Sequence, residues 1–561
     1  MRQRALGLLS AVAVIVAACS SPPATTAPSV APTTAPSVAP TTAPSVAPTS
    51  PPAGGGTFTV TRLSDFPTCF HPICFQTGNQ YMNFQLLYNS LVKVDADEST
   101  FIPDLADTWE VSPDATSFTF HLNPDAKWHD GTPVTADDVI FTAAQAAQFA
   151  DSYVGTYSIA NWLVVQGADA VKGTANIPEG LEKIDANTVK FTLTAPNAVW
   201  LNNLTDPAYM IMPKHLLEQF TAGDALKASD FVTGKATIGS GPYKMVKFTP
   251  DQAIEYAAHA EYHKGGPSIE QLVFVLNGNP DTAAAQLESG ELQMAFDLKP
   301  SDFDVLNGKE GIEVKQVPGV GQQSLQFPVS NPLVADKRVR QAIYYAFDRK
   351  ALLETVFNGA GKLLHIWLSF DENNPNLDKY EHNPEKAMQL IAEAEAAGFD
   401  KSKELRIIYY PEEPGWNEIA AALENDLRAV GLNPKLDPSD SAGWTAKLPD
   451  PTTYEISLQC CGSNLYPDKA SGAFNCETPV GTFYANCDLD AKFVAARSTG
   501  DAAEQKRIYD EIAEILNDEV MYGWLWAVAN THANSTRVGG FTYYPNARES
   551  FSQIEKWTLA P

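Results

Sequence analysis

The sequence has little positive charge. Its 561 residues include 39 Lys and Arg against 67 Asp and Glu, which gives a formal net charge of -28 at pH 7. Proteins that bind nucleic acids need clustered Lys and Arg to contact phosphates, and a broad grip on anionic membranes needs the same side chains. The charge balance therefore argues against both kinds of partner. We expect the negative net charge to serve mainly the solubility of the protein outside the cell.

The sequence also lacks the local motifs of common enzymes and metal sites. It contains no G-x-S-x-G, H-E-x-x-H or P-loop pattern, and no pair of Cys-x-x-Cys motifs. The acidic stretch Asp371–Pro375 lacks the glycine and the spacing of a calcium loop, so we interpret it as a solvated loop. No catalytic residue, metal ligand or cofactor is predicted. A glycosidase pair stays open, because carboxylates are abundant and nothing singles out two of them.

Long apolar runs are absent except at the N-terminus. Arg2 and Arg4 precede the run Ala5–Ala18, which is short for a transmembrane helix and has the proportions of a signal peptide. Small residues then precede Cys19, as in a bacterial lipobox. We therefore predict a signal peptide over residues 1–18, export, and a lipid on Cys19 that anchors the protein on the outer side of the cytoplasmic membrane. An ordinary signal peptide with a chance cysteine is the alternative.

Residues 19–56 have the composition of a disordered stalk. The octet APSVAPTT begins at Ala27, repeats at Ala35 and recurs with a final Ser at Ala43. Such Pro-, Thr- and Ser-rich sequence carries too little apolar surface to pack a core. We expect the stalk to hold the folded body away from the membrane. Whether its hydroxyl residues carry glycans is open.

From Thr57 onward, strand and helix patterns are interleaved. Thr57–Leu63 and Ser117–Leu122 alternate as strands. Asn417–Val430 carries one apolar stripe and is followed by Gly431, a common helix terminator. The mixture predicts an α/β fold, and the length favours two lobes over one core. Further helices are expected at Ala136–Phe149, Val339–Phe357, Pro384–Ala397 and Ala502–Leu516.

The segment Pro103–Val139 carries the most specific signal. It reads PDLADTWEVSPDATSFTFHLNPDAKWHDGTPVTADDV, a turn-rich hairpin followed by a helix that Thr135 would cap. This segment closely resembles the signature of the family 5 extracellular solute-binding proteins, the dipeptide-, oligopeptide- and nickel-binding type. Further matching elements follow in the family's order, at Gly239–Tyr243, Asp336–Arg349 and Asn383–Phe399.

The resemblance covers about Thr57 to Leu559 and implies a two-lobed clamp of the periplasmic-binding-protein type (type II, large variant with an extra subdomain). Lobe I would hold residues 57–318 and a C-terminal return, 528–561, and lobe II would hold 319–527. The chain would cross between them near Pro318–Gln323 and Trp526–Asn530.

In this family a solute, by default a peptide, binds between the lobes, and a permease reads the closed form. The partners implied are the solute, the permease subunits of an ABC importer with their ATPases, and the membrane through the lipid alone. We expect a monomer. An exported hydrolase and a ligand-sensing surface protein on the same fold are the alternatives of other classes.

The resemblance also implies three walls for the ligand cleft. The first wall is the loop Phe70–Gly78, the second is the loop Tyr409–Trp416, and the third is the turn Cys461–Asn464. The candidate ligand-binding residues are Phe70, His71, Phe75, Gln76, Thr77, Tyr409, Glu412, Trp416, Cys461, Gly462, Ser463 and Asn464.

Several of these candidates have a structural alternative. Trp416 could stack on a sugar or a cation, or it could pack onto its own helix. His71 is expected to cap its loop and not to bind a metal. Ser463 and Asn464 are candidates through alignment alone, and a polar turn is the simpler interpretation.

Two charges that relatives use for dipeptides are missing. Those relatives place an Arg in the second wall for the peptide carboxylate and an Asp in the third for the peptide amine. Here Tyr409–Trp416 contains no Arg, and Ser463 takes the place of the Asp. A carboxylate without its Arg partner would lose roughly 1.5–3 kcal/mol. A free dipeptide is therefore disfavoured, while a longer peptide held by its backbone, an oligosaccharide, or a cationic or amphipathic solute stays open.

Six cysteines besides Cys19 form an even set, which favours disulfides in an exported protein. Cys69 and Cys74 are close enough to staple the first wall. Cys460 and Cys461 are adjacent and would point to opposite faces of a strand. We therefore expect each of them to pair separately with Cys476 or Cys487, in either arrangement, and we expect the bridges to stiffen the walls.

Overall fold

The computed structural model describes residues 56–560 except 63–68, 75–77, 98–99, 154–159, 277–278, 297, 299–304, 368, 412, 414, 464–465, 475, 477–483 and 546–549. The predicted signal peptide, Cys19 and the stalk lie outside the described residues. Residues 54–561 form one compact unit. Among the described residues, no helix combines the length and apolarity needed to cross a membrane.

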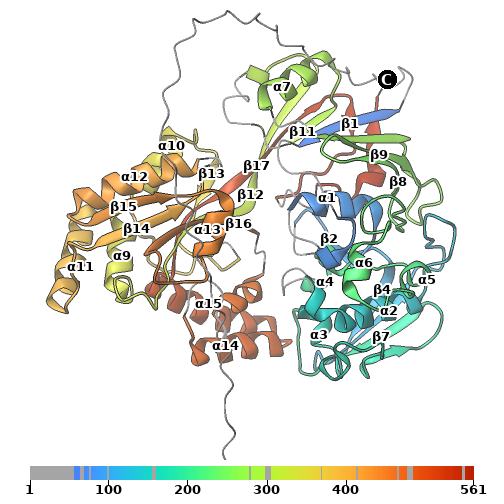
Figure 1. Cartoon of the computed structure of the whole chain (residues 1–561), viewed down its shortest axis with the longest axis horizontal. Helices are drawn as coiled ribbons and strands as arrows, with labels where there is room; N and C mark the ends of the chain where they lie inside the picture. Colours follow the sequence, from blue (N-terminus) through green and yellow to red (C-terminus); the bar gives the residue numbers. More distant parts are fainter. Residues whose placement is uncertain are drawn as a thin grey trace, which may run out of the picture. The chain divides into compact units, whose positions relative to one another are not determined.

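The main sheet is mixed, with two long antiparallel strands at its centre. These strands, β12 (Ile312–Gln326) and β17 (Tyr522–Ser535), pair along most of their length (Figure 1). The described strands of this sheet number eleven, with β13 (Gly361–Leu363) pairing with β17 beside the main path. Along that path the order is β15 (Asn433–Pro438), β14 (Glu404–Tyr409), β16 (Ile456–Ser463), β12, β17, β11 (Met294–Phe296), β1 (Thr57–Arg62), β10 (Gln271–Leu276), β9 (Ala253–Ala258) and β8 (Tyr243–Thr249).

A second, smaller sheet lies in the N-terminal half of the chain. Its strands are antiparallel, and helix α2 (Ala136–Gln148) packs against it in one hydrophobic cluster. Helices α3 (Ala160–Leu163) and α4 (Trp200–Leu204) belong to the same cluster. The strand order is β4 (Ala106–Val111), β5 (Ser117–Leu122), β7 (Thr188–Thr192) and β6 (Leu181–Lys183).

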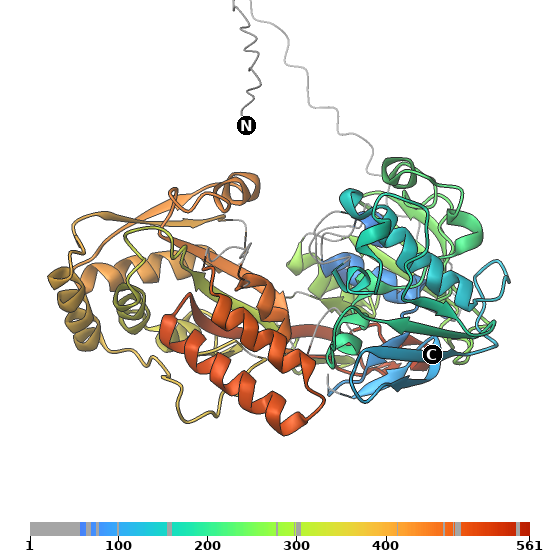
Figure 2. The same cartoon turned by 90° about the horizontal axis from the view of Figure 1, so that it is seen from below.

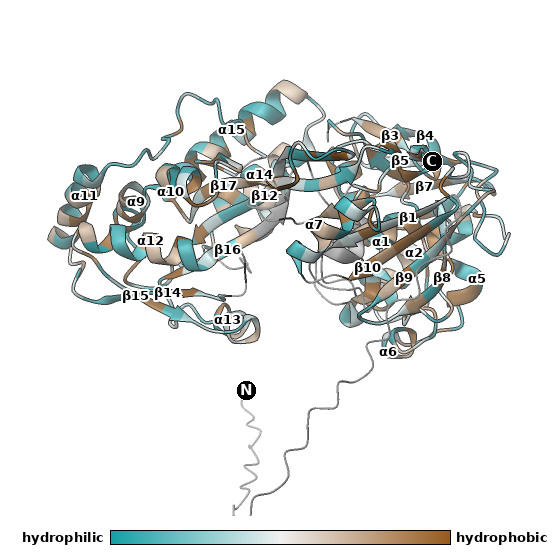
Figure 3. Cartoon of the chain, turned by 90° about the horizontal axis from the view of Figure 1, so that it is seen from above, coloured by the Kyte–Doolittle hydropathy of each residue, from teal (hydrophilic) through white to brown (hydrophobic). Residues whose placement is uncertain are grey.

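The hydrophobic side chains gather in separate clusters. Three clusters draw their buried residues from 58–312 and 533–557, and two draw theirs from 325–527. Hydrophobic colour runs along core strands such as β10 in Figure 3. Each cluster lies on one side of the boundaries predicted for the two lobes. We use lobe I for residues 56–318 and 528–560, and lobe II for residues 319–527.

Lobe II has helices on both faces of its part of the sheet. Leu525 and Trp524 are consecutive in β17 but belong to different clusters, as expected for side chains on opposite faces of a strand. One cluster contains α9 (Lys337–Ala346), α11 (Pro384–Ala396) and α12 (Trp416–Ala429). The other contains α14 (Cys487–Ser498) and α15 (Ala502–Glu519), which lie side by side in Figure 2.

One predicted helix is wrong. The sequence predicted a single helix over Val339–Phe357, but the structure contains α9 and a second helix, α10 (Arg349–Thr355). Phe347 is extended between them, and the Asp348 carboxylate accepts the Ala351 N–H at 2.9 Å, so Asp348 starts a new helix. The other predicted helices and strands begin and end within a few residues of the observed ones.

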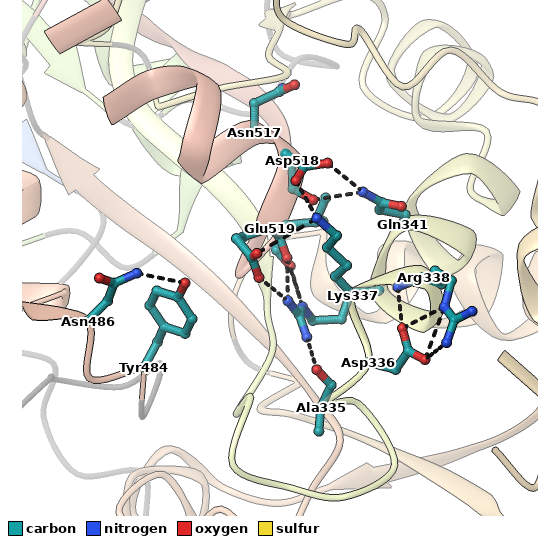
Figure 4. Close-up of polar contacts among 12 residues, drawn as sticks. Ala335, Asp336, Lys337, Arg338, Gln341, Tyr484, Asn486, Asn517, Asp518 and Glu519 are labelled. Atoms are coloured by element: carbon teal, nitrogen blue, oxygen red, sulfur yellow. Dashed lines mark hydrogen bonds and ion pairs between the residues drawn. The ribbon is translucent and has the colours of Figure 1, made fainter. Parts of the chain in front are cut away.

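The start of α9 is fixed to the end of α15 by polar contacts (Figure 4). Arg340 is buried, and its guanidinium donates to the carbonyls of Val334, Ala335 and Glu519. It also pairs with the Glu519 carboxylate at 3.0 Å. The Asp336 carboxylate caps α9 by accepting the Arg338 N–H at 2.9 Å. This segment therefore has a framework role, because its charges are used inside lobe II.

Lobe I contains a buried charge network around Asp104, which follows β3 (Phe101–Pro103). The Asp104 carboxylate is fully buried, accepts the Ser90 N–H at 2.8 Å, and lies 3.0 Å from Lys264 Nζ and 3.4 Å from Lys93 Nζ. Burial alone would raise the pKa of Asp104, but the charges of Lys264, Lys93 and His263 hold it down at about 2. The network therefore favours the ionised carboxylate.

We predict that Asp104→Asn lowers the free energy of unfolding at neutral pH by about 3–5 kcal/mol, because it leaves buried cations without a counter-charge. Since the pKa of Asp104 is lower in the folded than in the unfolded protein, its contribution is present above about pH 4 and is lost as the pH falls toward about 2. Urea unfolding measured between about pH 4 and pH 2 should show that the free energy of unfolding falls less steeply with decreasing pH in the variant than in the parent protein. Asp107→Asn, at an exposed position, is the control; an equal effect there would contradict the assignment.

Candidate functional site

The two crossing strands lose their register where the chain passes between the lobes. Val317 pairs with Asn530, and Gly321 pairs with Val528, so residues 318–320 face one residue of β17. Pro318 suits such a bulge because it has no N–H to give to the ladder. The irregularity falls within the two crossing segments that the sequence predicted, and it is a natural place for the sheet to bend.

The second predicted wall begins at the carboxyl end of β14. Tyr409 is buried in the lobe II core, and Glu412 lies outside the described residues. Trp416 is 0% exposed, and its indole N–H donates to the Gln323 side-chain oxygen at 2.9 Å. Its ring packs against Tyr410 and Trp444, with centroid distances of 4.5 and 5.6 Å. In this conformation Trp416 is therefore a core residue, as the packing alternative proposed, and offers no surface to a ligand.

The third predicted wall is part of a strand and not a turn. Cys461, Gly462 and Ser463 are the last residues of β16, and their side chains lie outside the described residues, as does all of Asn464. Gly462 pairs with Gln322 and Ser463 with Gly321. The prediction of a turn failed because β16 stays paired with β12 up to the crossing.

The second and third walls therefore meet on β12. Gln323 bonds to Trp416 of the second wall, and its neighbours Gly321 and Gln322 pair with β16 of the third. Glu413 connects the second wall to β16 just before the third wall, because one carboxylate oxygen accepts from Tyr410 at 2.8 Å and the other lies 3.4 Å from Cys460 Sγ. The sequence analysis missed Gln323, Tyr410 and Glu413. The run of glutamines in β12 was the available signal, since strands that only pack a core seldom carry them.

The first predicted wall lies in lobe I. Phe70 and His71 are buried there, and the Tyr88 hydroxyl donates to the Phe70 carbonyl at 2.6 Å. His71 accepts the Ile73 N–H on Nδ1 at 3.0 Å, and burial lowers the pKa of His71 to about 3. A neutral, backbone-bonded ring matches the predicted loop-capping role. The remaining candidates of this wall, Phe75, Gln76 and Thr77, lie outside the described residues.

The walls differ in how they are joined. Within the described part of the chain, no hydrogen bond or ring contact connects Phe70 or His71 to the second or third wall. The first wall thus belongs to one core, and the other two belong to the other core.

The disulfides correct one expectation. Cys69 is joined to Cys74 in the first wall. Cys476 is joined to Cys487, so the predicted separate pairing of these two with Cys460 and Cys461 is wrong. Cys460 is itself disulfide-bonded, and the side chain of Cys461 lies outside the described residues. The Cys476–Cys487 bridge closes the loop before α14 and does not reach β16.

The second wall holds acidic and aromatic side chains and no basic one. The nearest Arg along β14 is Arg406, and its guanidinium is paired with the buried Glu455 carboxylate at 2.7 Å. Arg406 also donates to the Thr452 carbonyl at 2.7 Å. It is therefore committed to lobe II and is not available to bind a ligand carboxylate beside Trp416.

Comparison with known proteins gives consistent matches. Residues 100–479 match the family model of bacterial extracellular solute-binding proteins, family 5 middle. A dipeptide-binding protein of Escherichia coli (strain K12) is 26% identical over 471 residues, covering 81% of this chain and 86% of that protein. Heme-binding protein A of Haemophilus influenzae is 24% identical over 506 residues, covering 86% and 90%.

Solved structures share the fold. The oligopeptide-binding protein AppA from Bacillus subtilis, in complex with a nonapeptide, has a TM-score of 0.75 at 21% identity, covering 90% of this chain and 99% of that one. The substrate-binding protein CtaP from Listeria monocytogenes has a TM-score of 0.78 at 24% identity, covering 90% and 100%. These likenesses confirm the predicted α/β fold class.

We predict that Trp416→Phe lowers the free energy of unfolding by about 1–3 kcal/mol, because it leaves the buried Gln323 oxygen without its donor. Trp444→Phe is the matched control, since its N–H donates to Ser457 Oγ at 3.1 Å from a half-buried position, and a smaller loss is expected. Urea unfolding measures both. If Trp416→Phe left the stability unchanged but abolished ligand binding, Trp416 would be a ligand-binding residue and not a core residue.

Proposed function

The chain belongs to the bacterial extracellular solute-binding proteins of family 5, and we propose that it captures a solute between lobe I and lobe II and delivers it to the permease of an ABC importer. The observation that carries this proposal is the pair of strands β12 and β17, which connect two separately packed sets of clusters and lose register between them. Such a connection lets each lobe move as a body while the sheet stays continuous.

Ligand contacts made by both lobes would drive closure. A hinge equilibrium shifts only by the difference in ligand affinity between the open and closed forms. Walls that belong to separate cores supply that difference, because a solute touches all of them only when the lobes approach. We therefore propose that ligand binding closes the lobes and that no reaction is catalysed. The permease would recognise the closed form.

The proposed ligand is a solute without the two charged ends of a free dipeptide. The second wall has no Arg, and Arg406 nearby is paired with Glu455. Relatives carry names that include dipeptide-binding and heme-binding proteins, so the fold accommodates different solutes. A longer peptide held through its backbone is the family default. An oligosaccharide or a cationic or amphipathic solute is the alternative, favoured by the acidic Glu413 and the ring of Tyr410 beside it.

A thermal-shift screen of residues 57–561 tests the solute class. The panel should contain dipeptides, longer peptides, oligosaccharides, polyamines and nickel complexes. A true ligand at 100 times its dissociation constant should stabilise the protein by about 2.7 kcal/mol. Tight binding of free dipeptides would contradict the role given to the missing charges. Consumption of a panel compound, in place of stoichiometric binding, would favour the exported hydrolase.

We further propose that the mature protein is held at the membrane by a lipid on Cys19. The support is the short apolar run and the small residues before this cysteine. Cys19→Ala should move the protein from the membrane fraction to the soluble fraction and remove the mass of the acyl chains from the intact protein. Cys69→Ala, which leaves the leader unchanged, is the control. A membrane-bound Cys19→Ala protein without added mass would refute the anchor.

A further inference from the structure

Lobe II contains a pocket that is separate from the proposed solute site. Its volume is about 590 Å³, within the range of small-molecule sites. It is bounded by the start of α10, by the end of β13, and by the segment 372–382. None of its lining residues comes from the loop 409–416, from β16, or from the crossing segments.

A buried cation forms part of the pocket wall. Arg349 is 7% exposed, and its guanidinium donates to the carbonyls of Lys379 and Tyr380 at 2.9 and 3.0 Å. It also donates to the carbonyls of Leu364 and Trp524. All of these acceptors are neutral, and no described carboxylate lies within ion-pair distance. Arg340, by contrast, forms an ion pair with the Glu519 carboxylate. The Arg349 charge is thus compensated only by neutral groups, namely these carbonyls, the Tyr344 hydroxyl and the Tyr344 ring, whose centroid lies 4.2 Å away. A negative group in the pocket would be stabilised beside it.

The rim of the pocket presents one free charge of each sign. Two lining acids are already used: Asp348 pairs with His382 at 3.2 Å, and Glu372 pairs with Lys362 at 2.7 Å. Lys379 and Glu381 also line the pocket, and neither forms an ion pair with any residue that the structure describes. A bound molecule could therefore meet a cation and an anion on the same short segment.

The residue between these two charges is held rigidly. Tyr380 has a φ of 46°, in the left-handed region that residues other than glycine rarely adopt. Its ring stacks on Tyr344 with a centroid distance of 4.7 Å, and its hydroxyl donates to the Asn517 carbonyl at 2.9 Å. Strain of this kind persists where the surroundings fix it, and it is frequent at binding sites. The backbone that carries Lys379 and Glu381 is therefore preorganised.

His365 is a neutral part of the pocket wall. It lines the pocket, and its Nε2 is buried without a hydrogen-bond partner. The pKa of His365 is lowered by burial, and a hydrogen bond to the Glu372 backbone offsets only part of this effect. Because Nε2 is the nitrogen without a partner, Nδ1 makes that bond, and Nε2 keeps a lone pair that lacks a donor. That nitrogen has no exposed surface, so it does not face a molecule in the pocket.

We propose that this pocket binds a small zwitterion, a molecule with one carboxylate and one ammonium group such as a free amino acid. The carboxylate would lie toward Arg349 and Lys379, and the ammonium toward Glu381. A simple anion fits less well, since Glu381 would repel it. A simple cation fits less well, since Arg349 and Lys379 would repel it.

Titration calorimetry of the whole mature protein tests the proposal, with L-alanine as the probe and acetate and methylammonium as its two halves. L-alanine should bind more tightly than either half. Lys379→Gln and Glu381→Gln should each weaken L-alanine binding about fivefold, as expected for partly exposed charge pairs. Both positions are exposed, so both variants should fold with an unchanged melting temperature. Lys403→Gln, at another exposed position of lobe II, should leave the affinity unchanged.

The other outcomes overturn the proposal. They are an absence of L-alanine binding at any soluble concentration, binding that neither variant weakens, and acetate binding as tight as that of L-alanine and insensitive to Glu381→Gln. The variants also separate this pocket from the solute site. An amino acid bound between the lobes would be unaffected by either substitution.

Discussion

The antiparallel pairing of β12 and β17 is the constraint on which the rest of the structure depends. These strands come from positions about two hundred residues apart in the chain, yet they form the centre of one sheet that runs through both lobes. Each neighbouring element is placed through them. β16 and Trp416 attach to β12, while β11 and β13 attach to β17. The pairing shifts register at residues 318–320 and again between Gln323 and Ser324, so the irregular stretch lies between the two sets of clusters.

Buried charges fix the framework around that sheet. Arg340 ties α9 to the end of α15, Arg349 ties α10 to β17 through the Trp524 carbonyl, and Asp104 holds two lysines in lobe I. All three lie in the segments that identify the family. Their partners are inside the fold, so these segments preserve the scaffold and say little about the solute. We therefore propose that specificity comes from the wall residues.

The sequence predicted the scaffold better than the site. The hydrophobic period and the capping residues located most helices. The family resemblance predicted the segments where the chain would cross between the lobes. The break at Phe347 was missed because an apolar helical period continues through it, although Asp348 carried a capping signal. For Trp416 the sequence left ligand stacking and packing onto its own helix open, although the residue lies on the same stripe of α12 as Ile419 and Leu423, which are buried with it. The cysteine pairing and the lobe II pocket depend on contacts between loops that are distant in the chain, and local sequence patterns do not predict such contacts.

The position of β17 has a consequence for the biogenesis of the protein. It lies between β12 and β11 in the sheet, but its last residue is Ser535 of a 561-residue chain. A nascent chain that stops short of it has β11 and β12 as open strand edges, which are prone to wrong pairing. The sheet that unites the molecule can therefore close only after the chain has been made as far as Ser535. The central pairing of the sheet thus cannot form before this late strand arrives.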